Sequence, residues 1–171
     1  CTLWQIVDDP HTAAWTPAGH SVVSSVRLAV AGLLASPAAE VQRSAPPLRP
    51  AAARVEAGHP MSVAFALQTL HELRQAQDVV VEEAPGSRSV MQRHLPMAGA
   101  DSFYTMASGG LGHGMPAAVG VALGRRKLGL PGRVIALIGD GSSLYSIQAL
   151  FSAARLQLPL TFVILNNRRY A

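Results

Sequence analysis

The chain has 171 residues, of which 49% are apolar, 14% charged and 5% aromatic, and its formal net charge is +4. Its basic residues are scattered and few aromatics accompany them, which argues against a nucleic-acid partner. Its apolar stretches are far shorter than the about 20 residues that span a bilayer, and its single cysteine, Cys1, leaves no disulfide within the chain. We therefore expect a cytoplasmic protein that meets no membrane and has one domain, or one domain with part of another.

The first 35 residues contain a short predicted strand and a predicted helix. Residues 3–7, "LWQIV", are apolar except for Gln5 and end at the turn signal DDP, whereas apolar residues recur at helical spacing over 21–35. Residues 36–57 contain four prolines and no periodicity, which is typical of a linker. The chain also opens without Met on an apolar run. We expect a fragment of a longer protein, in which residues 1–35 are the tail of a separate α/β domain.

From residue 58 to residue 171, helical and strand patterns alternate. The predicted helices cover 60–73, a brief segment after 88, 115–128 and 143–156. The predicted strands cover 78–82, 102–107, 133–138 and 160–165. Strands that alternate with helices form parallel sheets with helices on both faces. The predicted fold class of this second domain is therefore α/β.

The motif "IGDG" follows the predicted strand 133–138 and places Asp140 between two glycines. The next predicted strand, 160–165, ends at the pair Asn166-Asn167. A strand–helix–strand crossover makes its two strands parallel, so both end at the same edge of the sheet. Such edges are where open α/β sheets bind ligands. We therefore expect the side chains of Asp140 and Asn167 to meet there.

The carboxylate of Asp140 and the amide oxygen of Asn167 are hard oxygen donors. Two such side chains leave several positions open around a cation that prefers six ligands. Such a set is typical of Mg²⁺ or Ca²⁺, with phosphate oxygens and water in the remaining positions. Gly139 and Gly141 allow close backbone approach to a diphosphate, and the following helix directs free N–H groups there. In the alternative interpretation, Asp140 caps the next helix and the two asparagines form a separate turn.

The spacing of these two motifs resembles the signature of the thiamin-diphosphate enzymes, since 24 residues, 142–165, separate GDG from NN. The stretches "SGGLGHGMPAAVGVALG" and "IGDGSSLYSIQALFSAARLQLPLTFVILNN" also resemble the cofactor-binding half of the benzoylformate decarboxylase group within that family. The resemblance implies that residues 58–171 are most of the diphosphate-binding domain, truncated at its C-terminal end. It implies that residues 1–35 are the end of the family's central domain.

The resemblance also implies a set of site residues. It implies that Mg²⁺ (or Ca²⁺) is held by the side chains of Asp140 and Asn167 and by the carbonyl of Arg169. Residues implied to contact thiamin diphosphate itself are Gly141, Ser142 and Tyr145 at the diphosphate, Gly86 and Ser87 through their N–H groups, and Gly109 and Leu111 at the thiamin rings. Leu111 would be the apolar wedge that bends the cofactor, the alternative being an ordinary core leucine.

By the same resemblance, the activity is non-oxidative loss of CO₂ from a small 2-oxo acid to give an aldehyde. The Glu that activates the cofactor comes, in this family, from an N-terminal domain of a partner subunit. We therefore assign no catalytic residue to this chain, expect it to be inactive alone, and expect a homodimer or homotetramer of the full-length protein. Two alternatives remain: an acetolactate-synthase-like carboligase, and a non-catalytic assembly or regulatory module of the same fold.

Several other features have two interpretations. Residues 112–117, "GHGMPA", fit the dinucleotide-binding pattern GxGxxA, but the strand before them is weak and no acidic residue follows at the expected distance. Glu82 and Glu83 either face the crevice or belong to a charged loop, and Arg88 either meets a substrate carboxylate or is a surface arginine. The resemblance also implies that Thr105 and Ser108 stand at positions that are more apolar in an aryl-binding relative, which argues against selectivity for benzoylformate itself.

Overall fold

The computed structural model describes residues 2–37, 44, 52–97 and 99–168. The chain divides into two compact units, Cys1–Leu48 and Arg49–Ala171. The first unit contains β1 (Trp4–Val7), α1 (Pro10–Ala14), β2 (His20–Val23) and α2 (Val26–Ala35). Its two strands are parallel, with Trp4 opposite His20 and Val7 opposite Val23. Neither helix of this unit has a buried residue.

The predicted helix over 21–35 is wrong in its first part. His20–Val23 forms strand β2, because consecutive β-branched valines favour the extended backbone. The helix begins only at Val26, where the Ser25 hydroxyl accepts a hydrogen bond from the backbone N–H of Leu28. Helix α1 was not predicted: the DDP turn signal is its start, with Asp9 as N-cap. Most of the predicted linker over 36–57 lies outside the described residues.

The second unit contains a four-stranded sheet in the order β4-β3-β5-β6, and every neighbouring pair of strands is parallel. Its elements in chain order are α3 (Val63–Leu73), β3 (Val79–Glu83), the 3₁₀ helix η1 (Pro85–Ser87), α4 (Arg88–His94), β4 (Phe103–Thr105), α5 (Gly114–Lys127), β5 (Val134–Gly139), α6 (Asp140–Ser143), α7 (Ala149–Arg155) and β6 (Leu160–Leu165). The predicted α/β fold with a parallel sheet is confirmed.

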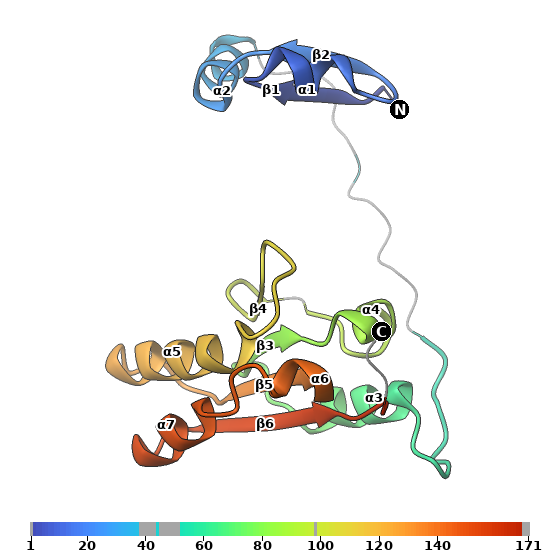
Figure 1. The fold of residues 1–171 in the computed structure, drawn as a ribbon, viewed down its shortest axis with the longest axis vertical. Coiled ribbons are helices and arrows are strands. Elements are labelled where there is room, and N and C mark those ends of the chain that lie inside the picture. Colours follow the sequence, from blue (N-terminus) through green and yellow to red (C-terminus); the bar gives the residue numbers. More distant parts are fainter. Residues whose placement is uncertain (1, 38–43, 45–51, 98, 169–171) are drawn as a thin grey trace. The chain divides into compact units, whose positions relative to one another are not determined.

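Helices cover both faces of this sheet (Figure 1). On one face, α5 and α7 pack on alternate residues of the central strands, including Val81, Ala136 and Ile138. On the other face, α3 and α4 pack on Val80 and on residues of β5. Because β3 and β5 are covered on both sides, the apolar runs that predicted them are continuous rather than alternating.

Two helix boundaries differ from the prediction. The helix expected over 143–156 begins only at Ala149, as α7, and the short helix α6 precedes it; turns with i→i+3 hydrogen bonds occupy the interval, as from Leu144 N–H to the Gly141 carbonyl. Helix α3 begins at Val63 rather than at Pro60, because Ser62 caps it by accepting from the N–H of Phe65.

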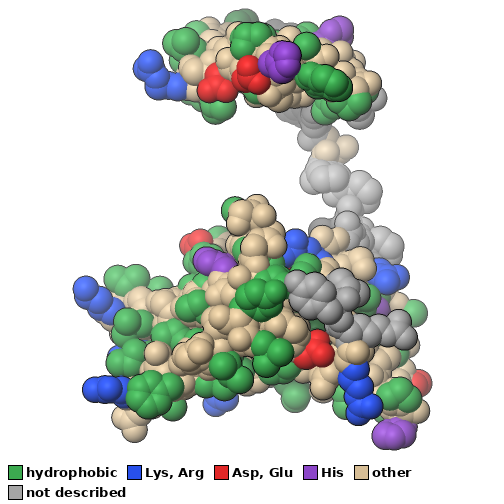
Figure 2. All heavy atoms as spheres, in the orientation of Figure 1, with side chains coloured by type: hydrophobic (Ala, Val, Ile, Leu, Met, Phe, Trp, Pro, Cys, Tyr) green, Lys and Arg blue, Asp and Glu red, His purple; other side chains and the backbone are tan. Residues whose placement is uncertain are grey.

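None of the helices within the described residues combines the length and the apolar character needed to cross a membrane. On the face drawn in Figure 2, Lys and Arg side chains stand apart from one another rather than gathering into one patch.

Candidate functional site

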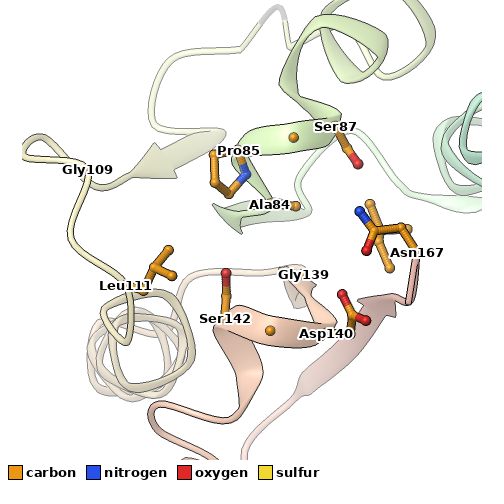
Figure 3. A pocket seen from close by; sticks show the side chains of 12 residues that line it. Ala84, Pro85, Ser87, Gly109, Leu111, Gly139, Asp140, Ser142 and Asn167 are labelled. Atoms are coloured by element: carbon orange, nitrogen blue, oxygen red, sulfur yellow. The ribbon is translucent and has the colours of Figure 1, made fainter. Parts of the chain in front are cut away.

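A cavity of about 310 Å³ opens at the carboxyl edge of the sheet. Four segments line it: the turn after β3, the loop before α5, the start of α6 after β5, and the end of β6 (Figure 3). The lining residues are Ala84, Pro85, Gly86, Ser87, Gly109, Leu111, Gly139, Asp140, Gly141, Ser142, Leu165 and Asn167. Segments more than 80 positions apart in the chain therefore meet around one hollow.

Asp140 reaches this cavity from the end of β5. Five consecutive residues of that strand, Val134–Ile138, are buried, so its end is fixed in position. Gly139 is the last residue of the strand and lies opposite Leu165 of β6, so the two neighbouring strands end at the same level. The chain then turns directly into α6, with Gly139 as N-cap and Asp140 as the first helical residue. The Asp140 carboxylate is half-buried and points toward Asn167 (Figure 3).

The two asparagines after β6 differ in what they can bind. The side-chain oxygen of Asn166 accepts a hydrogen bond from the backbone N–H of Arg168 at 3.0 Å, which closes a tight turn. Asn167 lines the cavity, and its amide group lies across from the Asp140 carboxylate (Figure 3). The structure thus brings together the two side chains predicted to hold a cation. The third predicted ligand, Arg169, lies outside the described residues.

Two short segments face each other across the cavity and present small residues and hydroxyl groups. Gly86 and Ser87 belong to η1, directly after β3. Gly141 and Ser142 belong to α6, and Ser142 is only 7% exposed. The side chains of Ser87 and Ser142 both point into the hollow between these segments (Figure 3). Four of the five residues predicted to contact a diphosphate therefore line a single cavity, and the fifth, Tyr145, does not.

The loop before α5 forms the remaining wall. Gly109 has φ of +78°, a left-handed conformation that favours glycine, although a Cβ there would meet nothing within 4 Å. Leu111 is half-buried, and its side chain extends toward the cavity (Figure 3). Tyr145, in contrast, is not among the lining residues and is 59% exposed. A Cβ added to Gly112 would lie 3.0 Å from the Tyr145 Cβ, so Tyr145 packs on this loop.

Neither interpretation of Glu82 and Glu83 is correct. They are the last two residues of β3, each is 1% exposed, and neither lines the cavity. Their position could have been found from the sequence, because they continue the run "VVVEE" without a turn residue. Arg88 is not a free surface arginine either: its Nη2 lies 2.9 Å from the Glu82 carboxylate, and the side chain is 39% exposed.

The dinucleotide interpretation of residues 112–117 lacks its structural context. Such a motif needs a strand that turns directly into a helix. Here β4 ends at Thr105, and eight residues, 106–113, separate it from α5. The glycines at 112 and 114 instead donate backbone hydrogen bonds to Glu83.

The donor set of the cavity suits a cation that is completed by a ligand. Its one charged lining residue is Asp140, and the lining contains no Lys or Arg among the described residues. Nor do the described residues contain a group of three or more His, Cys, Asp or Glu side chains able to hold a metal. One carboxylate and one amide leave several positions of a six-coordinate ion open for phosphate oxygens and water. The residues present therefore fit Mg²⁺ with a bound diphosphate better than an ion held by protein alone.

Comparisons with known proteins identify the family of the domain that contains this cavity. A family model described as "Thiamine pyrophosphate enzyme, C-terminal TPP binding domain" matches residues 85–171. Benzoylformate decarboxylase of Pseudomonas aeruginosa is 35% identical over 172 residues, which cover 98% of this chain and 31% of that protein. The crystal structure of benzoylformate decarboxylase from Polynucleobacter necessarius superimposes with a TM-score of 0.80 at 33% identity, over 99% of this chain and 32% of that one.

The chain is also similar, over a shorter part of its length, to a more distant relative. The large subunit of acetolactate synthase isozyme 2 from Escherichia coli is 33% identical over 115 residues, which cover 65% of this chain and 20% of that protein. The chain thus spans about a third or less of the length of each of these relatives.

Proposed function

The chain belongs to the thiamine pyrophosphate enzymes through their C-terminal cofactor-binding domain, and from this we propose that it is part of a Mg²⁺-dependent 2-oxo acid decarboxylase. The observation that carries the proposal is the convergence of Asp140 and Asn167, from neighbouring parallel strands, on one cavity. These two side chains would hold the metal, and the carbonyl of Arg169 would add a third ligand.

Each wall of the cavity would have its own part in holding the cofactor. Gly86, Ser87, Gly141 and Ser142 would bind the diphosphate by backbone N–H groups and hydroxyls. Gly109 and Leu111 would contact the thiamin rings, and the apolar Leu111 side chain would exclude water from them. When bound, thiamin diphosphate supplies a carbon nucleophile and an electron sink for the carbanion left by CO₂. The chain's own contribution is to bind and orient that group.

The substrate class rests on the relatives. Benzoylformate, named for two of them, is a 2-oxo acid, and its decarboxylation yields an aldehyde. Decarboxylation is favoured over carboligation because the similarity to benzoylformate decarboxylase covers 98% of the chain, against 65% for acetolactate synthase. The chain spans only 31% of the length of that decarboxylase. We therefore propose that the activating Glu lies in another part of the full-length protein, and that the full-length protein is a homodimer or homotetramer.

The test begins with binding to the full-length protein. The described residues that line the cavity include no Lys or Arg to neutralise a diphosphate, so thiamin diphosphate should bind only when Mg²⁺ or Ca²⁺ is present. Calorimetric titration with and without EDTA measures this dependence. Incubation with a single 2-oxo acid should then release CO₂ and an aldehyde. An acyloin as the main product would assign the protein to the carboligases, and metal-dependent binding without turnover of any 2-oxo acid would favour the non-catalytic module. Metal-independent binding would contradict the proposed site.

A further inference from the structure

Two consecutive carboxylates end strand β3 inside the protein. Glu82 and Glu83 are each 1% exposed. Successive side chains of a strand point to opposite faces of the sheet, so the two carboxylates face opposite ways. Burying a carboxylate is costly unless hydrogen bonds satisfy its oxygens, so the partners of each one show what it does.

Glu82 holds the segment that follows β3. One of its oxygens accepts the backbone N–H of Ala84 at 2.6 Å, at the start of the cavity lining. The other accepts the Nε and Nη2 of Arg88 at 3.1 and 2.9 Å. It also accepts the hydroxyl of Thr105 at 2.8 Å. The bonds to Ala84 and Arg88 bracket residues 85–87, so this carboxylate fixes both ends of η1.

Glu83 holds a different wall of the cavity. Its two oxygens accept the backbone N–H groups of Gly112, at 2.6 Å, and Gly114. The contact is close, because a Cβ added to Gly114 would lie 2.6 Å from the Cβ of Glu83 and 2.8 Å from Ile138. Both donors lie just beyond Gly109 and Leu111, the two residues of this loop that line the cavity. Glu83 therefore ties that loop to the central strand.

We propose that Glu82 and Glu83 are positioning residues that hold opposite walls of the cofactor cavity: Glu82 the η1 wall and Glu83 the Gly109–Leu111 wall. That the first wall meets the diphosphate and the second the thiamin rings rests on the proposed function. The holding of each wall rests only on the hydrogen bonds above.

The clearest substitutions are Glu82→Gln and Glu83→Gln, which keep shape and remove charge. An amide has one acceptor oxygen and an NH₂ group that only donates, so in Glu83→Gln one glycine N–H loses its acceptor. Glu83→Asp keeps the charge but is shorter, and its effect should be smaller than that of Glu83→Gln. The matched control is Glu72→Gln on α3, whose carboxylate pairs with Arg54 at the surface, with 42% of the Glu72 side chain exposed.

Two probes separate the walls in the full-length protein: Mg²⁺ with inorganic pyrophosphate, and Mg²⁺ with thiamin diphosphate. Substituting residues that position the groups in direct contact with a bound metal typically lowers metal affinity or activity 10–100-fold. Glu83→Gln should weaken thiamin diphosphate by at least about 10-fold and leave pyrophosphate within about 2-fold, because only the former needs the Gly109–Leu111 wall. Glu82→Gln should weaken both by a similar factor, and Glu72→Gln neither. Equal loss of both probes in Glu83→Gln would overturn the assignment of the two walls.

Amide hydrogen exchange of the unliganded protein tests whether each glutamate fixes its wall of the cavity in place. Glu83→Gln should speed exchange in residues 109–114 and leave 84–88 unchanged, whereas Glu82→Gln should do the reverse. If either substitution speeded exchange throughout the second unit, the glutamate would stabilise the fold as a whole rather than one wall of the cavity. That result would contradict the proposal. If the unsubstituted protein bound neither probe, the proposed function would fail, and the exchange pattern would still decide whether the two carboxylates hold these walls.

Discussion

Strands β3 and β5 lie side by side at the centre of the sheet, and acidic residues stand at the end of each, but the acids are placed differently. At the end of β3 the carboxylates of Glu82 and Glu83 are buried, and backbone or side-chain donors from nearby segments surround them. At the end of β5 the carboxylate of Asp140 is half-buried and faces the cavity. Glu83 lies opposite Ile138, two residues before Asp140, so acids at the ends of two paired strands divide into two kinds.

The difference follows from where each strand stops. β3 continues through both glutamates before the chain turns, so their side chains stay within the layers of the sheet. β5 stops at Gly139, and the turn into α6 carries Asp140 out to the edge. A carboxylate inside the strand can accept hydrogen bonds only from the protein groups packed around it. A carboxylate beyond the strand end faces the cavity and can bind a ligand or a cation from solution. Each substitution below tests this distinction.

The largest expected effect is that of Asp140→Asn. Asparagine keeps the shape but loses the charge that would face a divalent cation, so Mg²⁺-dependent binding of thiamin diphosphate should weaken by more than about 100-fold, beyond the range typical of residues behind the ligands. The stability of the unliganded protein should change by less than about 0.5 kcal/mol, because no apolar contact is removed. Titration calorimetry and thermal unfolding measure the two quantities.

Asp101→Asn is the control for this substitution, since Asp101 is an exposed aspartate outside the cavity and its left-handed backbone suits asparagine as well. The affinity of the Asp101→Asn variant for thiamin diphosphate should equal that of the unsubstituted protein. If Asp140→Asn weakened binding less than Glu83→Gln, the division between binding and holding acids would be wrong.

The next effect concerns the contact between β3 and the loop before α5. Gly114→Ala places a methyl group against the Glu83 Cβ and Ile138, which should destabilise the protein by about 1–3 kcal/mol. Gly120→Ala, in the same helix, meets nothing within 4 Å and should stabilise it by about 0.5–1 kcal/mol. Urea unfolding of both variants gives the difference. Equal stability of the two would mean that the loop is not packed tightly on Glu83.

The parts of the molecule that the sequence predicted are those set by local pattern. Apolar runs located β3, β5 and β6 to within one residue at each end, and alternation with helices predicted the parallel sheet. The parallel crossover also predicted that Asp140 and Asn167 would share an edge, because strand direction alone decides it. Helix starts were less accurate: that of α3 depends on a serine cap, and that of α6 on a glycine next to the strand end.

What the sequence could not predict is contact between distant segments. The partners of Glu83 lie 29 and 31 residues further along the chain, and no local pattern connects them. The bond between Glu82 and Thr105, 23 residues further along, likewise depends on β4 taking the edge beside β3. The strand β2 pairs with β1 across a separation of 16 residues, and the helical spacing of apolar residues over 21–35 outweighed the local preference of its valines for a strand.

The smallest expected effect tests the donors around Glu82. Thr105→Val removes a hydroxyl that donates to Glu82 and lies 3.0 Å from Nη2 of Arg88, while the Arg88–Glu82 ion pair remains. Losing one such bond should destabilise the protein by about 0.5–1.5 kcal/mol. Thr161→Val, at an exposed position of β6, is the matched control and should stay within about 0.5 kcal/mol. Because Glu82 holds η1 chiefly through Ala84 and Arg88, Mg²⁺-pyrophosphate affinity should not change in Thr105→Val. A loss comparable to that of Glu82→Gln would instead show that the Thr105 hydroxyl, and with it strand β4, fixes the η1 wall.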